Sequence, residues 1–244
     1  MQRVLHRFIP GIFRVYKACL FLLLSLVAPT SAETLTIGTA SITYETPQGF
    51  SRADALFPLQ LEELDKKFGM RTVVFAKYVP TAYLAIRETD SEALPDWYLH
   101  LTYDEKFSRL PLNRAAFVTT TVLLDKVIGH EYTTDDFKKK LEDVFRHAIG
   151  RNLTIVSMTQ KGFMEKRDKA RSMLATGHAV IEGRTGSLDF PIATLTTFVL
   201  EQRKLIAMVQ IGRIRSDADL PAFTQQALDR VSQMLPSTGQ TRSQ

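Results

Sequence analysis

Residues 192–214 read IATLTTFVLEQRKLIAMVQIGRI and carry the strongest strand signal in the chain. Both apolar halves are rich in β-branched and aromatic residues, which favours strands over 192–200 and 205–214. The polar residues 201–204 between them form a short turn, so an antiparallel hairpin is predicted. In the second strand, alternation sends Leu205, Ala207, Val209 and Ile211 to one face and Ile206 and Met208 to the other. A strand that is apolar on both faces needs cover on both sides of its sheet.

Helices are expected to supply this cover, because three stretches show helical periodicity. Residues 134–149 combine a Thr cap, two acidic residues in the first turn and an apolar stripe that ends before Gly150. Residues 60–68 and 219–235 each show an apolar stripe at helical spacing and are followed by Gly69 and Pro236. Further strands are predicted at 34–44, 71–79, 83–87, 97–103, 116–124, 153–159 and 179–182. The predicted fold class is α+β, a mainly antiparallel sheet covered by helices.

The first 32 residues have the three-part layout of a secretory signal peptide. Arg3, Arg7, Arg14 and Lys17 precede an apolar run over 18–28, and small residues follow at 28–32. This run is shorter than the roughly 20 apolar residues of a membrane span. Cleavage is predicted between Ala32 and Glu33, which makes the mature protein secreted and places it in the periplasm. The alternative interpretation is an uncleaved leader that anchors the chain to the inner membrane.

The mature part shows no repeat and no Pro/Gly/Ser-rich linker, so residues 33–236 are predicted to form a single domain. Residues 237–244 are expected to be a disordered tail. The chain of 244 residues is 45% hydrophobic and 23% charged, which is typical of a globular protein. Its single cysteine, Cys19, lies inside the leader, and the apolar run follows rather than precedes it. The mature chain therefore offers no disulfide, thiol nucleophile or thiolate ligand, and lipidation of the cysteine is not expected.

The net charge of +5 also arises mainly from the leader. Four of the 31 basic residues lie there and none of the 26 acidic residues does, which leaves 27 basic residues against 26. This balance gives no electrostatic reason to expect binding to nucleic acid. Any basic binding surface must therefore be local.

Motifs for catalysis, metals and cofactors are absent from the sequence. There is no Gly-x-Ser-x-Gly or Ser-x-x-Lys motif of serine hydrolases, and no glycine-rich phosphate loop. The histidines are scattered rather than spaced as metal ligands, at His100, His130, His147 and His178. We predict no catalytic residues, no metal site and no cofactor.

Two segments are candidates for binding. In the strand at 97–103, Tyr98, His100 and Thr102 share one face and are predicted to line a groove for a hydrogen-bonding ligand, unless that face is simply half-exposed. Residues 161–171, KGFMEKRDKAR, form a predicted basic loop or helix that would contact an anionic membrane or an acidic partner. Its cations are Lys161, Lys166, Arg167, Lys169 and Arg171, and an ordinary solvated segment is the alternative.

The order of elements resembles that of the PsbP-like and DcrB-like secreted proteins. The segment ITYETPQGF at 42–50 is similar to their entry strand and Pro-x-Gly-aromatic turn. The second half of that fold is similar to five further segments: the helix at 134–149, VIEG at 180–183, the strand at 194–200, the return strand at 204–212 and the closing helix. The resemblance implies an α/β/α sandwich and a non-enzymatic envelope or lumen protein that binds partners. It supplies no catalytic motif.

The sequence thus favours a secreted, non-enzymatic envelope protein that binds another protein or envelope component. One alternative is an envelope hydrolase whose site is assembled from distant residues such as Tyr98, His100 and Glu131. Another is a carrier of a small apolar ligand within the sandwich. The sequence does not indicate an oligomeric state.

Overall fold

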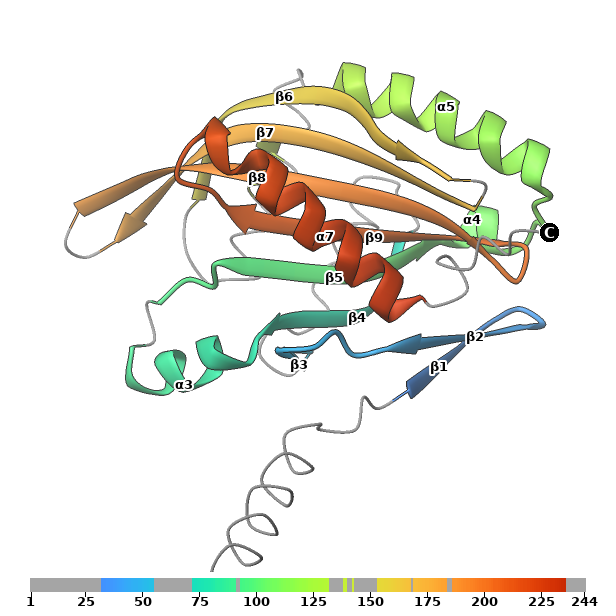
Figure 1. Ribbon diagram of the computed structural model, residues 1–244, viewed down its shortest axis with the longest axis horizontal. Helices are drawn as coiled ribbons and strands as arrows, with labels where there is room; N and C mark the ends of the chain where they lie inside the picture. The colour runs from blue at the N-terminus through green and yellow to red at the C-terminus, as the bar shows by residue number, and fades with distance from the viewer. Residues whose placement is uncertain are drawn as a thin grey trace, which may run out of the picture. The chain divides into compact units, whose positions relative to one another are not determined.

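The computed structural model describes residues 32–54, 72–90, 93–131, 138–139, 142, 153–167, 169–183 and 186–235. These residues belong to one compact unit that begins at Ala32. Among them, a seven-stranded sheet has the order β3-β4-β5-β9-β8-β7-β6, and every neighbouring pair is antiparallel (Figure 1). A separate hairpin is formed by β1 (Ala32–Ile37) and β2 (Ala40–Glu45). The sheet strands are β3 (Phe50–Arg52), β4 (Thr72–Pro80), β5 (Trp97–Asp104), β6 (Leu153–Lys166), β7 (Ala170–Gly183), β8 (Gly186–Glu201) and β9 (Lys204–Arg213).

The hairpin predicted at 192–214 is confirmed as β8 and β9, which lie in the interior of the sheet. Gln202 and Arg203 both adopt positive φ, at 47° and 63°, as the two central residues of a tight hairpin turn require. The two-faced apolar pattern is also confirmed, because Leu205, Ile206 and Met208 are all buried. Long strands on either side leave this hairpin with no free edge.

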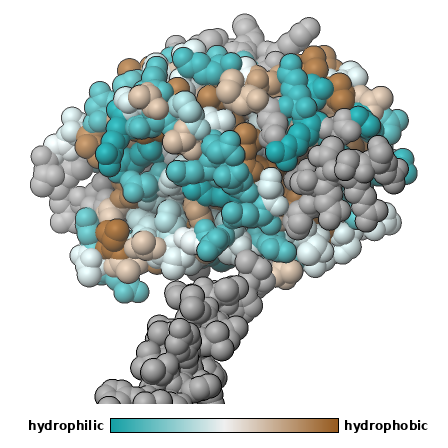
Figure 2. All heavy atoms as spheres, in the orientation of Figure 1, coloured by the Kyte–Doolittle hydropathy of each residue, from teal (hydrophilic) through white to brown (hydrophobic). Residues whose placement is uncertain are grey.

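One face of the sheet, here the α7 face, is covered by helix α7 (Leu220–Met234) and by the β1–β2 hairpin. The helix was predicted at 219–235 and buries Phe223, Ala227, Val231 and Met234 at helical spacing. It runs across the front of the sheet in Figure 1, and its outer surface is largely hydrophilic in Figure 2.

Gly212 allows α7 to approach β9 closely. A Cβ at this position would lie 2.6 Å from Cε2 of Phe223, so the missing side chain leaves room for the phenyl ring to pack against the strand. The ring of Phe223 stacks on that of Trp97 with centroids 4.5 Å apart and planes 7° apart.

The opposite face, here the α5 face, is covered by helix α5 (Arg114–Glu131). Phe117 is buried against Met173, Phe198, Leu200 and Leu205 of the sheet. Helices therefore lie on both faces of a mainly antiparallel sheet, and the predicted fold class is confirmed.

Two predicted strands are helices. Residues 83–87 lie in α3 (Thr81–Thr89), which starts directly after Pro80, and residues 116–124 lie in α5. The β-branched run from Val118 to Val122 favoured a strand, but Asn113 accepts a hydrogen bond from the backbone of Ala116 at 2.8 Å and caps a helix instead. The buried hydroxyl of Thr121 bonds back to the carbonyl of Phe117 at 3.0 Å, so the helix accommodates it.

Three other boundaries are corrected. The strand predicted at 34–44 is two strands, because Gly38 turns the chain with φ of 62°. The strands predicted at 153–159 and 179–182 are much longer, so the segment 161–171 is the end of the β6–β7 hairpin rather than a loop or helix. The helix predicted at 60–68 lies outside the described residues. Of the helix predicted at 134–149, only residues 138, 139 and 142 are described, and these are helical.

Candidate functional site

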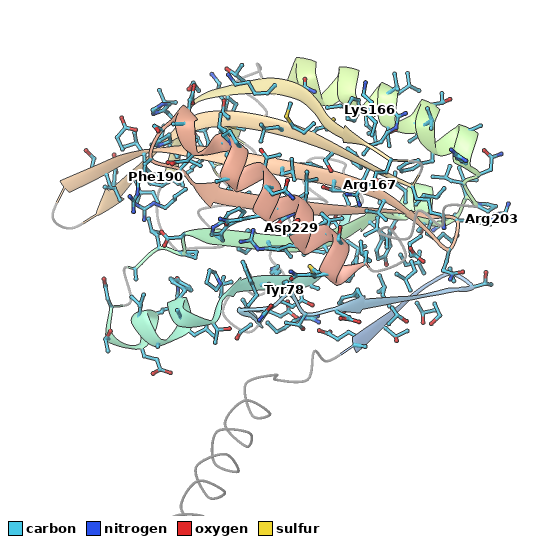
Figure 3. The ribbon with its side chains drawn as sticks, in the orientation of Figure 1. Tyr78, Lys166, Arg167, Phe190, Arg203 and Asp229 are labelled. Atoms are coloured by element: carbon cyan, nitrogen blue, oxygen red, sulfur yellow. The ribbon has the colours of Figure 1, made fainter. Side chains whose placement is uncertain are left out.

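Basic side chains from three segments far apart in sequence gather at one end of the sheet. The segments are the β6–β7 turn, the β8–β9 turn, and the connection between α4 (Glu105–Ser108) and α5. Three contacts join them: the backbone amide of Leu200 donates to Lys169 (2.8 Å), that of Leu112 donates to Arg203 (2.8 Å), and Nζ of Lys204 donates to the carbonyl of Ser108. We call this the basic end, and its residues are Arg109, Arg114, Lys166, Arg167, Lys169, Arg171 and Arg203. Arg167 and Arg203 are labelled in the right half of Figure 3.

Aromatic and apolar side chains lie among these cations. The ring of Phe163 has Nζ of Lys166 and Cζ of Arg171 each 5.6 Å from its centroid. Cation–π contacts of this kind hold long side chains over a surface. Leu110 and Met164 are 57% and 44% exposed. The basic end therefore combines positive charge with exposed hydrocarbon, as protein- and membrane-binding surfaces do.

The sequence identified only part of this surface. It picked out Lys161, Lys166, Arg167, Lys169 and Arg171, and the structure places the last four at the hairpin end, with Lys161 further back along β6. Arg109, Arg114 and Arg203 were missed because nothing in their local sequence shows that the α4–α5 connection and the β8–β9 turn meet that hairpin. Arg203 was visible as a turn residue, and the pairing of β7 with β8 would have placed it there.

The other predicted site residues, Tyr98, His100 and Thr102, share the α5 face of β5. Tyr98 and Thr102 are only 7% and 5% exposed, so these two side chains are buried rather than half-exposed. Thr102 donates to the carbonyl of Ala207 at 3.5 Å, and Tyr98 borders a small pocket. Of the three predicted residues, Tyr98 is the one in the lining of that pocket.

His100 lies directly opposite Lys77 on β4, and Lys77 is 3% exposed. Burial, with a smaller contribution from the Lys77 charge, lowers the pKa of His100 to about 3. Burial likewise lowers the pKa of Lys77. Nδ1 of His100 is shielded from solvent and has no hydrogen-bond partner among the described residues. His100 is consequently a neutral group inside the fold near neutral pH.

Within the described residues, no group of three His, Cys, Asp or Glu side chains is arranged to hold a metal ion. His178 pairs with Asp189 at 3.5 Å, and both side chains are exposed. No helix in the described part of the chain is long and apolar enough to span a membrane.

Comparison with known proteins adds the following. No protein-family model and no curated protein sequence matches the chain. The structure is similar to the crystal structure of the Saccharomyces cerevisiae Ran-binding protein Mog1p, with 10% identity and a TM-score of 0.36, over 86% of this chain and 94% of that one. At this level the similarity says nothing about the partner of the present chain. The resemblance to PsbP-like and DcrB-like proteins therefore stays a prediction.

Proposed function

We propose that this chain is a non-enzymatic protein that, after export to the periplasm, binds another protein or envelope component through the basic end. The observation that carries the proposal is the joining of three basic segments by backbone and side-chain hydrogen bonds. Surface cations fixed on connected turns form a surface that is organised before a partner arrives, which lowers the entropic cost of binding.

The chemistry of the basic end indicates an acidic partner surface. Among the described residues, Asp104, Glu105 and Glu201 bring carboxylates to the same end, against the seven cations that define it. Exposed charges attract a partner over about one Debye length, roughly 8 Å at physiological salt. Each exposed ion pair adds about 0.2–1 kcal/mol. Binding should therefore weaken as salt rises, while Leu110 and Met164 supply contacts that salt does not screen.

Charge reversal tests the role of the basic end. In the variant Arg167→Glu/Arg203→Glu, two attractive charges become repulsive, so partner recovery should fall roughly tenfold or more at low salt. The matched control is Arg215→Glu, an exposed arginine that follows the far end of β9. Quantitative affinity capture from envelope extract compares the three proteins.

Two results would contradict this function. One is a partner recovered equally well by all three proteins, since its binding would then not involve the basic end. The other is recovery of no component above background with the wild type. Binding to vesicles containing anionic lipid but to no protein would identify the envelope component as the membrane itself.

Export is tested separately. If the chain is cleaved between Ala32 and Glu33, osmotic shock should release it, and its intact mass should be that of a chain starting at Glu33. Glu33 already has a place in the fold: its carboxylate accepts from Tyr44 (3.1 Å) and Tyr78 (3.2 Å) and pairs with Arg52. A full-length mass in the membrane fraction would favour the anchored form instead.

A further inference from the structure

An apolar pocket lies on the α5 face of the sheet, at the end opposite to the basic end. Its floor and sides are formed by Tyr98, Ile211, Ile192, Ile181 and Leu153, from five different strands. Phe190, also in its lining, is labelled at the left end of the sheet in Figure 3, away from Arg203. β9 begins at the basic end and finishes at Arg213 in the pocket rim, so the two features lie at opposite ends of this ten-residue strand.

The outer wall of the pocket is the segment 94–96, which is anchored on both sides. On one side the hydroxyl of Tyr83 donates to the carbonyl of Ala93 at 3.2 Å. On the other, the backbone amide of Arg213 donates to the carbonyl of Asp96 at 2.9 Å. The wall is therefore held in place without a ligand, as is usual for small-molecule sites.

The rim carries one cation above the hydrocarbon. The guanidinium of Arg213 lies 4.9 Å from the ring centroid of Phe190. Its nearest carboxylate oxygen on Asp96 is 3.8 Å away, and the Asp96 side chain is 81% exposed. An ion pair this long and this solvated is weak, so a ligand carboxylate can replace it. Arginine presents a planar fork of donors that matches a carboxylate.

The size of the pocket limits the ligand. The cavity volume is about 50 Å³, room for a few water molecules. A cavity that binds benzene measures about 150 Å³, so this one suits a short branched chain rather than an aromatic ring.

We propose that this pocket binds a small branched carboxylate, with its hydrocarbon against Ile192 and Ile211 and its carboxylate at Arg213. The same chemistry occurs in a free short-chain acid and at the C-terminus of a peptide that ends in an apolar residue. The site is separate from the basic end and does not depend on the function proposed for it.

Methyl NMR of the mature protein labelled at isoleucine tests the proposal, because three isoleucines line the pocket. The probes are isovalerate, isoamyl alcohol as its uncharged analogue, and a short peptide ending in leucine with either a free or an amidated C-terminus. We expect saturable shifts confined to the pocket isoleucines, with isovalerate binding roughly tenfold more tightly than the alcohol because only the acid forms a charge-assisted hydrogen bond. A peptide with a free C-terminus that binds more tightly than isovalerate would identify a peptide as the source, and an excluded peptide would identify the free acid.

Variants separate the cation from the hydrocarbon. Arg213→Gln should weaken isovalerate roughly tenfold and leave the alcohol unchanged, whereas the control Arg215→Gln should change neither. Leu94→Phe, in the half-buried wall, should fill the pocket and abolish both, with thermal unfolding as the check that it folds. The proposal is overturned if neither isovalerate nor the peptide with a free C-terminus gives a saturable shift. It is also overturned if a folded Leu94→Phe protein binds isovalerate as tightly as the wild type does.

Discussion

Gly212→Ala should destabilise the protein although it adds only one methyl group. The new Cβ would lie 2.6 Å and 3.1 Å from Cε2 and Cδ2 of Phe223 and 3.3 Å from Cδ2 of Trp97. Contacts below 3.0 Å force atoms to move, and the Phe223 ring is buried under α7. Overpacking of a core costs about 1–3 kcal/mol, and a disturbed aromatic stack adds about 0.5–1.5 kcal/mol. We expect a loss of about 2–3 kcal/mol, which lowers Tm by about 5–10 °C.

Urea unfolding followed by tryptophan fluorescence is the suitable assay, because Trp97 is the only tryptophan and lies in the affected stack. A double-mutant cycle with Phe223→Leu supplies the control. The smaller side chain removes the atoms that the new Cβ would meet, so Gly212→Ala should cost much less in that background. If it costs as much in the Phe223→Leu protein as in the wild type, the contact between β9 and α7 is not the cause and the reasoning is refuted.

Three other predictions concern buried polar groups. The pKa of His100 is about 3 in the fold and about 6.5 in the unfolded chain, so only the unfolded chain takes up a proton as pH falls below 6.5. The free energy of unfolding should therefore fall by up to about 1.4 kcal/mol per pH unit between pH 6.5 and 3. His100→Asn should flatten that loss in urea unfolding at pH 7 and pH 5, and an unchanged slope would contradict it. Gln210→Ala removes a donor 2.7 Å from the carbonyl of Ala227 and should cost about 1–3 kcal/mol in thermal unfolding, with no loss counting against this bond. Ser172→Ala removes the hydroxyl that lies 2.9 Å from that of Thr197 and should lower the free energy of unfolding by about 1 kcal/mol. Adding Thr197→Val should recover most of this loss, because the second hydroxyl is then no longer left without its partner. If Thr197→Val has the same effect in the wild type and in Ser172→Ala, the two hydroxyls are not coupled.

The sequence predicted those parts of the fold in which side-chain alternation and packing agree. The β8–β9 hairpin and α7 were found because both strands are apolar in a consistent pattern and the helix has a single stripe. The sequence-based prediction was wrong for α5, where β-branched residues such as Val118 favour a strand locally. The cap from Asn113 and the burial of Phe117 stabilise a helix there instead. Packing against the sheet outweighs local propensity there.

The candidate sites divide in the same way. A run of cations within one hairpin is visible in sequence, so Lys166 and Arg167 were found. The contribution of Arg203 depends on a backbone bond between Leu112 and Arg203, which joins segments about 90 residues apart. Of the pocket lining, the sequence singled out only Tyr98, because the other residues come from different strands and each looks like ordinary core.

If the chain is exported as proposed, the pairing of Ala32 with Glu45 in the β1–β2 hairpin imposes an order of events on the removal of its leader. Proteases cleave a chain in an extended, unpaired form, yet the bond between Ala32 and Glu33 lies within a paired strand. Under the export proposal, leader removal must therefore precede closure of this hairpin. Under the same proposal, a chain whose hairpin closes first holds its processing site in a paired strand and stays tethered, so the rate of hairpin closure relative to cleavage decides between release and retention.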